Sequence, residues 1–192
     1  MCKTIWIIAT LAVFGVGASH GQQGARSSGA PAAATPTPSA PSCETIHAEQ
    51  KEDRFTGNLT VKTTPIVEAD KFHPLFIWLS ENPDILYFEI AGSADTWRYL
   101  TCHPVAMLAN GNRIALGGVE HQGQVNDGGF VAEIVITSVP WSETEKLMTA
   151  TQLEFKVCND EFQTPLEILC QVKDVIRIAK EWKKAAIRLK KK

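Results

Sequence analysis

Two histidines near the middle of the chain have the side chains with the widest range of chemistry. His103 follows Cys102 directly, and His121 lies in a glycine-rich stretch. Imidazole nitrogens and thiolates are common metal ligands, so a fold that brought them together would create a metal centre. Their spacing matches none of the C-x-x-C, H-x-H or H-x-x-x-H patterns, and oxidation of Cys102 would remove its thiolate. We therefore expect no metal and treat His103 and His121 as candidate ligand-binding residues.

Asp127 and Trp97 complete this candidate site. An acid beside a histidine can orient its imidazole, so Ser93, His121 and Asp127 could supply the three groups of a hydrolytic centre. No Gly-x-Ser-x-Gly turn is present, and the glycine-rich stretch lacks the Gly-Lys-Ser/Thr of a phosphate loop. The sequence therefore predicts no catalytic residue and no cofactor. It leaves, as an alternative, a small-ligand or metal-binding protein or an enzyme whose site is assembled around His103 and His121.

The cysteines indicate an oxidising compartment. Four of them remain once Cys2 is removed with a leader, and four thiols allow three pairings. We expect Cys158 to pair with Cys170, because closing a loop of this length is worth roughly 3 kcal/mol when the bridge is unstrained. Cys43 is then expected to pair with Cys102.

The first part of the chain has the composition of an export leader and a tether. Residues 1–18 consist of a short, positively charged segment followed by an apolar run. This pattern predicts a signal peptide cleaved after Ala18. Residues 19–42 are rich in Pro, Ala, Ser and Thr and predict a disordered linker. Cys43 lacks the preceding aliphatic residue of a lipoprotein signal. We expect an exported protein, periplasmic or secreted, that is not a lipoprotein.

Residues 43–192 are expected to form a single β-rich domain. Apolar runs bounded by turn residues predict its strands, and these runs cover residues 54–67, 75–79, 85–90, 97–108, 113–116, 130–139 and 153–157. Asn110-Gly111 predicts a tight hairpin, because both residues tolerate a positive φ. The glycine-rich segment 117–129 is expected to be irregular or a short hairpin.

Two helices follow from capping signals and apolar spacing. Ser142 with Glu145 predicts a short helix near 143–150. Thr164 and Pro165 predict the start of a long C-terminal helix near 165–188, whose apolar stripe must pack on something. The order of elements predicts an α+β fold, mainly an antiparallel β-sheet or sandwich with the long helix across one face or edge.

Charge is distributed unevenly along the chain. Residues 27–179 carry 20 acidic and 10 basic side chains, whereas 180–192 carry seven bases and one acid. An acidic body disfavours binding to nucleic acid. The basic end could rest on anionic lipid, or it could be a solvated helix end whose cations complement the helix dipole. The residues that would contact a membrane are Lys183, Lys184, Arg188, Lys190, Lys191 and Lys192.

Several motifs in the second half of the chain occur in an order that resembles a known family. They are Trp97-Arg98-Tyr99-Leu100, the hairpin from Asn110 to Leu116, His121-Gln122-Gly123-Gln124-Val125, Val131-Ala132-Glu133, and Leu153-Glu154-Phe155 followed by Glu161-Phe162. This order resembles a family of uncharacterised exported bacterial domains, β-rich and ending in a helix. The resemblance implies a fold and an exported location, but no activity, since the family has none assigned.

These observations favour a non-enzymatic envelope or secreted module that binds another envelope or secreted protein. A surface that binds such a partner is expected to include an exposed apolar patch or an unprotected edge strand. The ligand-binding alternative predicts a closed pocket with convergent polar groups. A third hypothesis is peripheral membrane association through the basic C-terminal tail.

Overall fold

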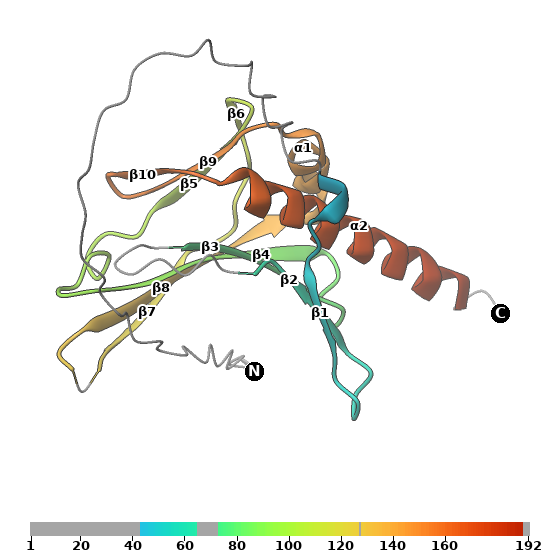
Figure 1. Cartoon of the computed structure of the whole chain (residues 1–192), viewed down its shortest axis with the longest axis horizontal. Helices are drawn as coiled ribbons and strands as arrows, with labels where there is room; N and C mark the ends of the chain where they lie inside the picture. The colour runs from blue at the N-terminus through green and yellow to red at the C-terminus, as the bar shows by residue number, and fades with distance from the viewer. Residues whose placement is uncertain (1–42, 65–72, 127, 190–192) are drawn as a thin grey trace, which may run out of the picture. The chain divides into compact units, whose positions relative to one another are not determined.

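Two antiparallel sheets stack on each other in the computed structural model (Figure 1). The structure describes residues 43–64, 73–126 and 128–189. The predicted signal peptide and linker, Asp127 and Lys190 to Lys192 lie outside these residues. One compact unit runs from Ala40 to Lys192.

The larger sheet has six strands and provides the base of the sandwich. Each strand is antiparallel to its neighbours. In spatial order the strands are β1 (Glu49–Glu52), β2 (Leu59–Lys62), β3 (His73–Leu79), β4 (Ile85–Ala94), β8 (Val131–Pro140) and β7 (Glu120–Val125).

The smaller sheet has four strands and covers part of one face of the larger one. In spatial order they are β10 (Asp160–Gln163), β9 (Leu153–Val157), β5 (Val105–Ala109) and β6 (Asn112–Arg113). The predicted hairpin between β5 and β6 is confirmed: Asn110 has φ 50° and Gly111 has φ 76°. Consecutive positive φ values give a turn whose twist matches that of the strands.

Alternating burial along the strands places the core between the two sheets. In β8 every second residue from Val131 to Val139 is buried, as expected for a strand with one face on a core. Phe88 of β4 meets Phe155 of β9 edge to face, with ring centroids 5.3 Å apart. This contact joins the inner faces of the two sheets. The inward series of β8 includes one acid, Glu133, which is fully buried.

The helices confirm the predicted fold class, α+β. A 3-10 turn (Cys43–Thr45) precedes β1, another (Trp141–Glu143) leads into α1 (Thr144–Thr149), and α2 (Leu166–Leu189) ends the described chain. The predicted caps are wrong. Glu143 stands at the start of α1 without a side-chain hydrogen bond, and the buried Thr164 hydroxyl finds no partner among the described residues. Both helices nevertheless form close to the predicted positions.

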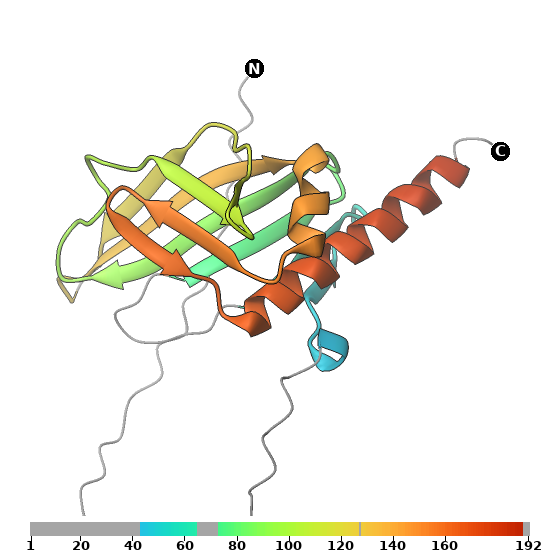
Figure 2. The ribbon, with the colours of Figure 1, turned by 90° about the horizontal axis from the view of Figure 1, so that it is seen from above.

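The helix α2 packs against β2 and β3, beside the smaller sheet (Figure 2). Trp182 meets Trp78 of β3 edge to face at 5.5 Å. Polar side chains of α2 also hold the first strands: Asp174 accepts the Ala48 N–H at 2.9 Å, and Gln171 accepts the Thr64 N–H at 2.6 Å. No helix in the described part of the chain is long and apolar enough to cross a membrane.

All four cysteines of the domain form disulfides, but not in the predicted pairs. Cys43 is joined to Cys170 of α2, and Cys102 is joined to Cys158. Our prediction assumed that nearness in sequence favours pairing. Cys158 lies at the turn after β9, and the chain then runs back along β10 before α2 begins, so Cys158 and Cys170 are carried to different places.

Peptide mapping under non-reducing conditions should recover the pairs Cys43 with Cys170 and Cys102 with Cys158. These bridges close loops of 127 and 56 residues. By loop entropy, replacing both cysteines of either pair with serine should lower the free energy of unfolding by about 4 to 5 kcal/mol in a denaturant titration. A peptide linking Cys158 to Cys170 would contradict the structure.

A buried acid on the other face of the larger sheet gives a second prediction. Glu89 of β4 is 4% exposed and alternates with the core residues Phe88 and Ile90. Burial raises the pKa of the Glu89 carboxyl above its ordinary value of 4.5, although the charge of Lys62 opposes the shift. Because the Glu89 pKa is higher in the folded than in the unfolded protein, its protonation stabilises the fold below pH 4.5. This stabilisation is lost as the pH rises through the pKa that Glu89 has in the folded protein.

The variant Glu89→Gln should therefore be more stable than the parent at neutral pH. The difference should shrink as the pH falls towards 4.5, where the parent carboxyl is also neutral. Urea titrations across this pH range measure it, with the more exposed Glu154→Gln as control. A stability gain that is independent of pH would show that the charge of Glu89 is not its cause.

Candidate functional site

The loop between β4 and β5 lies over the end of β7 and β8. The ring of Trp97 in this loop packs directly against Gly123 of β7, where a Cβ atom would collide with the ring. The same Cβ would also lie 3.0 Å from the carbonyl oxygen of Ala132. Glycine is therefore required at position 123 for the indole to approach the strand.

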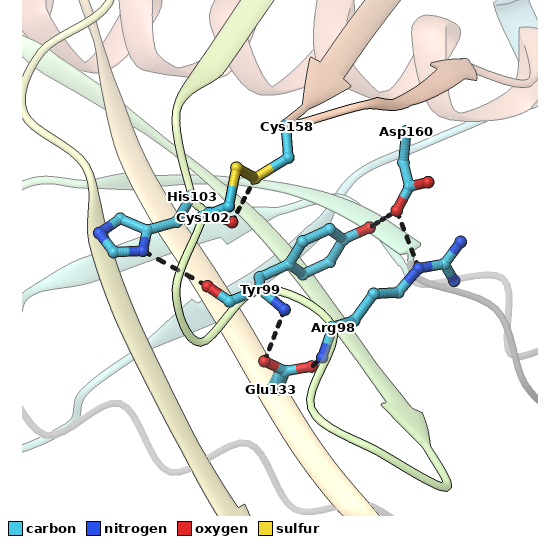
Figure 3. The surroundings of a disulfide bond; sticks show 7 residues. All are labelled: Arg98, Tyr99, Cys102, His103, Glu133, Cys158 and Asp160. Atoms are coloured by element: carbon cyan, nitrogen blue, oxygen red, sulfur yellow. Dashed lines mark hydrogen bonds and ion pairs between the residues drawn. A yellow bond between two sulfur atoms is a disulfide. The ribbon is translucent and has the colours of Figure 1, made fainter.

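The carboxylate of Glu133 holds this loop in place. Its oxygens accept the backbone N–H of Arg98 at 2.7 Å and that of Tyr99 at 3.0 Å (Figure 3). The Nε2–H of His121 donates to the same carboxylate at 2.9 Å. An acid without exposure to water is expensive unless donors surround it, and these three donors meet that need.

Three of the four predicted site residues come together beside this carboxylate. The ring of His121 lies 6.2 Å from that of Trp97 and 5.7 Å from that of His103, measured between centroids. The His103 Nδ1 is 3.4 Å from the carbonyl oxygen of Tyr99. Trp97, His103 and His121 therefore form one cluster. Asp127, the fourth candidate, lies outside the described residues.

A second carboxylate and a disulfide fix the far side of the loop. The Tyr99 hydroxyl donates to Asp160 Oδ2 at 3.0 Å, and the Nε–H of Arg98 donates to the same oxygen at 2.8 Å. Burial raises the pKa of the Tyr99 phenol, and the hydrogen bond to Asp160 raises it further, so the hydroxyl keeps its proton. The disulfide between Cys102 and Cys158 lies beside these contacts (Figure 3).

The geometry does not favour a metal centre at the histidines. Within the described residues, no group of three or more His, Cys, Asp or Glu side chains is placed to hold an ion. The rings of His103 and His121 are stacked, with 16° between their planes. One nitrogen of each ring already faces a protein oxygen: His121 Nε2 faces Glu133, and His103 Nδ1 faces the carbonyl oxygen of Tyr99.

The candidate hydrolytic trio is contradicted by the register of the larger sheet. Ser93 pairs with Ala132, whereas His121 pairs with Val135. Adjacent residues of a strand point to opposite faces, so Ala132 and Val135 lie on different faces of β8. Ser93 and His121 therefore project from opposite sides of the sheet and cannot act on one substrate.

A surface hollow lies elsewhere in the fold. It has a volume of about 480 Å³ and opens on the outer face of the smaller sheet. Its floor includes Ala106 and Leu108, and Arg113 and Glu154 stand around it. None of His103, His121 and Trp97 lines this hollow. This hollow is thus separate from the residues that suggested the ligand-binding hypothesis.

The β4–β5 loop and the ends of β7 and β8 carry exposed apolar side chains. Trp97 is 37% exposed, Leu100 in the same loop is 49%, Val125 at the end of β7 is 59%, and Phe130 just before β8 is 50%. The β4–β5 loop meets the hairpin formed by β7 and β8 where Trp97 packs on Gly123. We call Trp97, Leu100, Val125 and Phe130 the hairpin patch.

The two edges of the larger sheet differ in charge. At one edge, β1 has the sequence Glu-Gln-Lys-Glu, so three of its four side chains are charged. At the other edge, β7 has the sequence Glu-His-Gln-Gly-Gln-Val, in which only Glu120 is a fixed charge. Charged edges resist pairing with other strands, and neutral ones do not. Of these two edges, β7 is the unprotected one.

Sequence reasoning missed the two acids that organise the site. Glu133 carried a signal, because it occupies an inward position in an alternating apolar strand, where an acid needs partners. Asp160 gave no such signal, because an acid next to a turn is usually exposed to solvent. Gly123 looked like one turn glycine among several, and only the packing of Trp97 shows its role.

Comparison with models of known protein families found no match for this chain. Comparison with curated proteins also found none. The resemblance to exported bacterial domains therefore stays a prediction.

Glu133→Ala should lower the free energy of unfolding by about 3 kcal/mol, because two backbone N–H groups and His121 lose their acceptor. Tryptophan fluorescence in a urea titration reports the loss and the release of Trp97 from β7. The matched control is Glu120→Ala on the neighbouring strand, where the exposed acid should contribute less than about 0.5 kcal/mol. Equal effects of the two substitutions would contradict the role assigned to Glu133.

Proposed function

We propose that this protein is an exported, non-enzymatic module that binds an extended segment of another envelope or secreted protein along β7. The observation that carries the proposal is the exposed edge of β7, which has a single fixed charge, beside the hairpin patch. The segment would add a seventh strand to the larger sheet, a mode of recognition in which main-chain hydrogen bonds supply affinity.

The backbone of β7 supports this mode of binding. One side of β7 pairs with β8 from Glu120 to Val125. On its other side, no described strand pairs with it. A row of main-chain donors and acceptors is therefore presented to solvent, as in the strand edges that bind extended peptides.

The hairpin patch supplies apolar contacts next to that edge. Trp97 lies over Gly123, and Val125 follows two residues later on the same face of β7. Side chains on one face of an added strand would meet both residues, and this contact would favour partners with apolar side chains at alternate positions.

The loop that carries Trp97 is held before any partner arrives. Glu133, Asp160 and the Cys102 bridge fix it from three directions. A fixed loop loses little conformational entropy on binding, so more of the contact energy is retained as affinity. The two disulfides support the exported location, since such bridges persist in oxidising compartments.

Site-specific photo-crosslinking in the native host tests the proposal. A photoreactive amino acid replaces Gln122 in β7 or, as matched control, Gln50 in β1; both are exposed glutamines in edge strands. We expect a crosslinked partner from position 122 and none from position 50. Mass spectrometry of the product should place the crosslink in an extended segment with alternating apolar residues.

Substitutions in the patch should then weaken the crosslink. Trp97→Ala and Val125→Lys should lower its yield about tenfold, because a central apolar contact is often worth a factor of this size. Phe55→Ala, at an 83% exposed position in the turn between β1 and β2, should leave it unchanged. Equal crosslinking from positions 122 and 50 would contradict the proposal. So would a crosslink yield that stays the same in the patch variants.

A further inference from the structure

The C-terminal end of α2 runs out beyond the two sheets. Figures 1 and 2 show the helix extending past the strands towards the C-terminus from two perpendicular directions. Its buried residues end at Ala179, whereas the helix continues to Leu189. We call the part from Lys184 to Leu189 the helix tip; these six residues span about 9 Å of helix.

The residues just before the tip are anchored firmly. Trp182 packs on Trp78, and the Lys183 ammonium lies 2.7 Å from Asp84 Oδ1 and 3.2 Å from the carbonyl oxygen of Pro83. The same ammonium lies 4.2 Å from the centre of the Trp141 ring. The tip therefore starts from a fixed point.

The apolar stripe of α2 continues into the tip, beyond the sheet that buries it. Trp182, Ala185, Ala186 and Leu189 follow at intervals of three and four residues, so they share one face of the helix. Leu189, on this face, is 74% exposed, and Ile187, on the opposite side of the helix, is 55% exposed. A stripe that packs on β2 and β3 within the domain is thus left uncovered at the tip.

The helix tip also carries cations. Lys184 and Arg188 are exposed in the tip, and the sequence continues with Lys190, Lys191 and Lys192. The sequence before the helix tip is acidic, with 20 acids against 10 bases between residues 27 and 179. The positive charge of the protein is therefore concentrated at the same end as the exposed apolar residues.

We propose that the helix tip binds the surface of an anionic membrane. Helices bind membrane surfaces through burial of exposed apolar side chains in the interface and through attraction of Lys and Arg to anionic lipid, and the tip offers both kinds of side chain. The lipid headgroups attract the basic tip and repel the acidic body, so the domain would be held by this end with its sheets away from the lipid. A second copy of the chain fits less well, because pairing two tips would bring their cations together.

Vesicle sedimentation with residues 40–192, which form one compact unit, tests this inference without the N-terminal apolar run. We expect retention on vesicles that contain phosphatidylglycerol and not on phosphatidylcholine alone. Raising the salt to about 1 M should release the protein, since the Debye length then falls to about 3 Å.

Two substitution pairs separate the tip from other surfaces. Ile187→Glu with Leu189→Glu, or Lys184→Gln with Arg188→Gln, should lower retention about tenfold or more, because each pair removes one of the two attractions. The matched control is Arg54→Gln with Phe55→Glu in the β1–β2 turn, where a cation also lies beside an exposed ring. Circular dichroism confirms that the variants are folded.

Three results would overturn the inference. The first is the absence of binding to the anionic vesicles, and the second is retention that the tip substitutions leave unchanged. The third is a tip-dependent dimer, seen by light scattering, that replaces the vesicle contact. None of these bears on β7, so the strand-binding proposal can fail or succeed independently.

Discussion

The carboxylate of Glu133 is the point on which this end of the molecule depends. It sits on the core side of β8 without exposure to water, where a carboxylate is stable only if donors surround it. The two N–H groups from the β4–β5 loop and the imidazole of His121 are those donors. Because the buried carboxylate needs these donors, it fixes the path of the β4–β5 loop, residues 95–104. The same path places Trp97 over Gly123.

The contacts of Glu133 explain why the two histidines lie where they do. His121 is a partner of a structural acid, and His103 stacks on it beside the Cys102 bridge. Both histidines thus belong to the group of contacts around Glu133, beside the edge strand β7.

The sequence predicted the fold class well, since local signals decide it. An apolar run identified β8, alternation identified β9 and helical spacing identified α2. Asn110-Gly111 identified a turn whose backbone angles only a few residues tolerate. The predicted disulfide pairs were wrong because pairing depends on which chain segments meet in the fold. No local sequence pattern indicates which segments these are. Trp97 was expected at the start of an apolar run, yet it lies in a loop, because its partners come from β7.

The candidate site could be predicted only in part for the same reason. The grouping of His103, His121 and Trp97 was proposed from residue types, and the structure brings these three together. The acids that hold them come from β8 and β10, which are distant in sequence from the loop, and their roles depend on the register of two sheets. One-residue changes in register would have moved Glu133 to the opposite face of β8.

The bridge between Cys43 and Cys170 has a mechanical consequence. It links the first described residue of the domain directly to α2, which is buried against the larger sheet. Tension on the chain before Cys43 passes through this covalent bond into the helix and bypasses β1 and β2. An edge hairpin would otherwise peel away strand by strand under such a pull, so the bridge lets the protein carry load at its N-terminal side while the sheet stays intact.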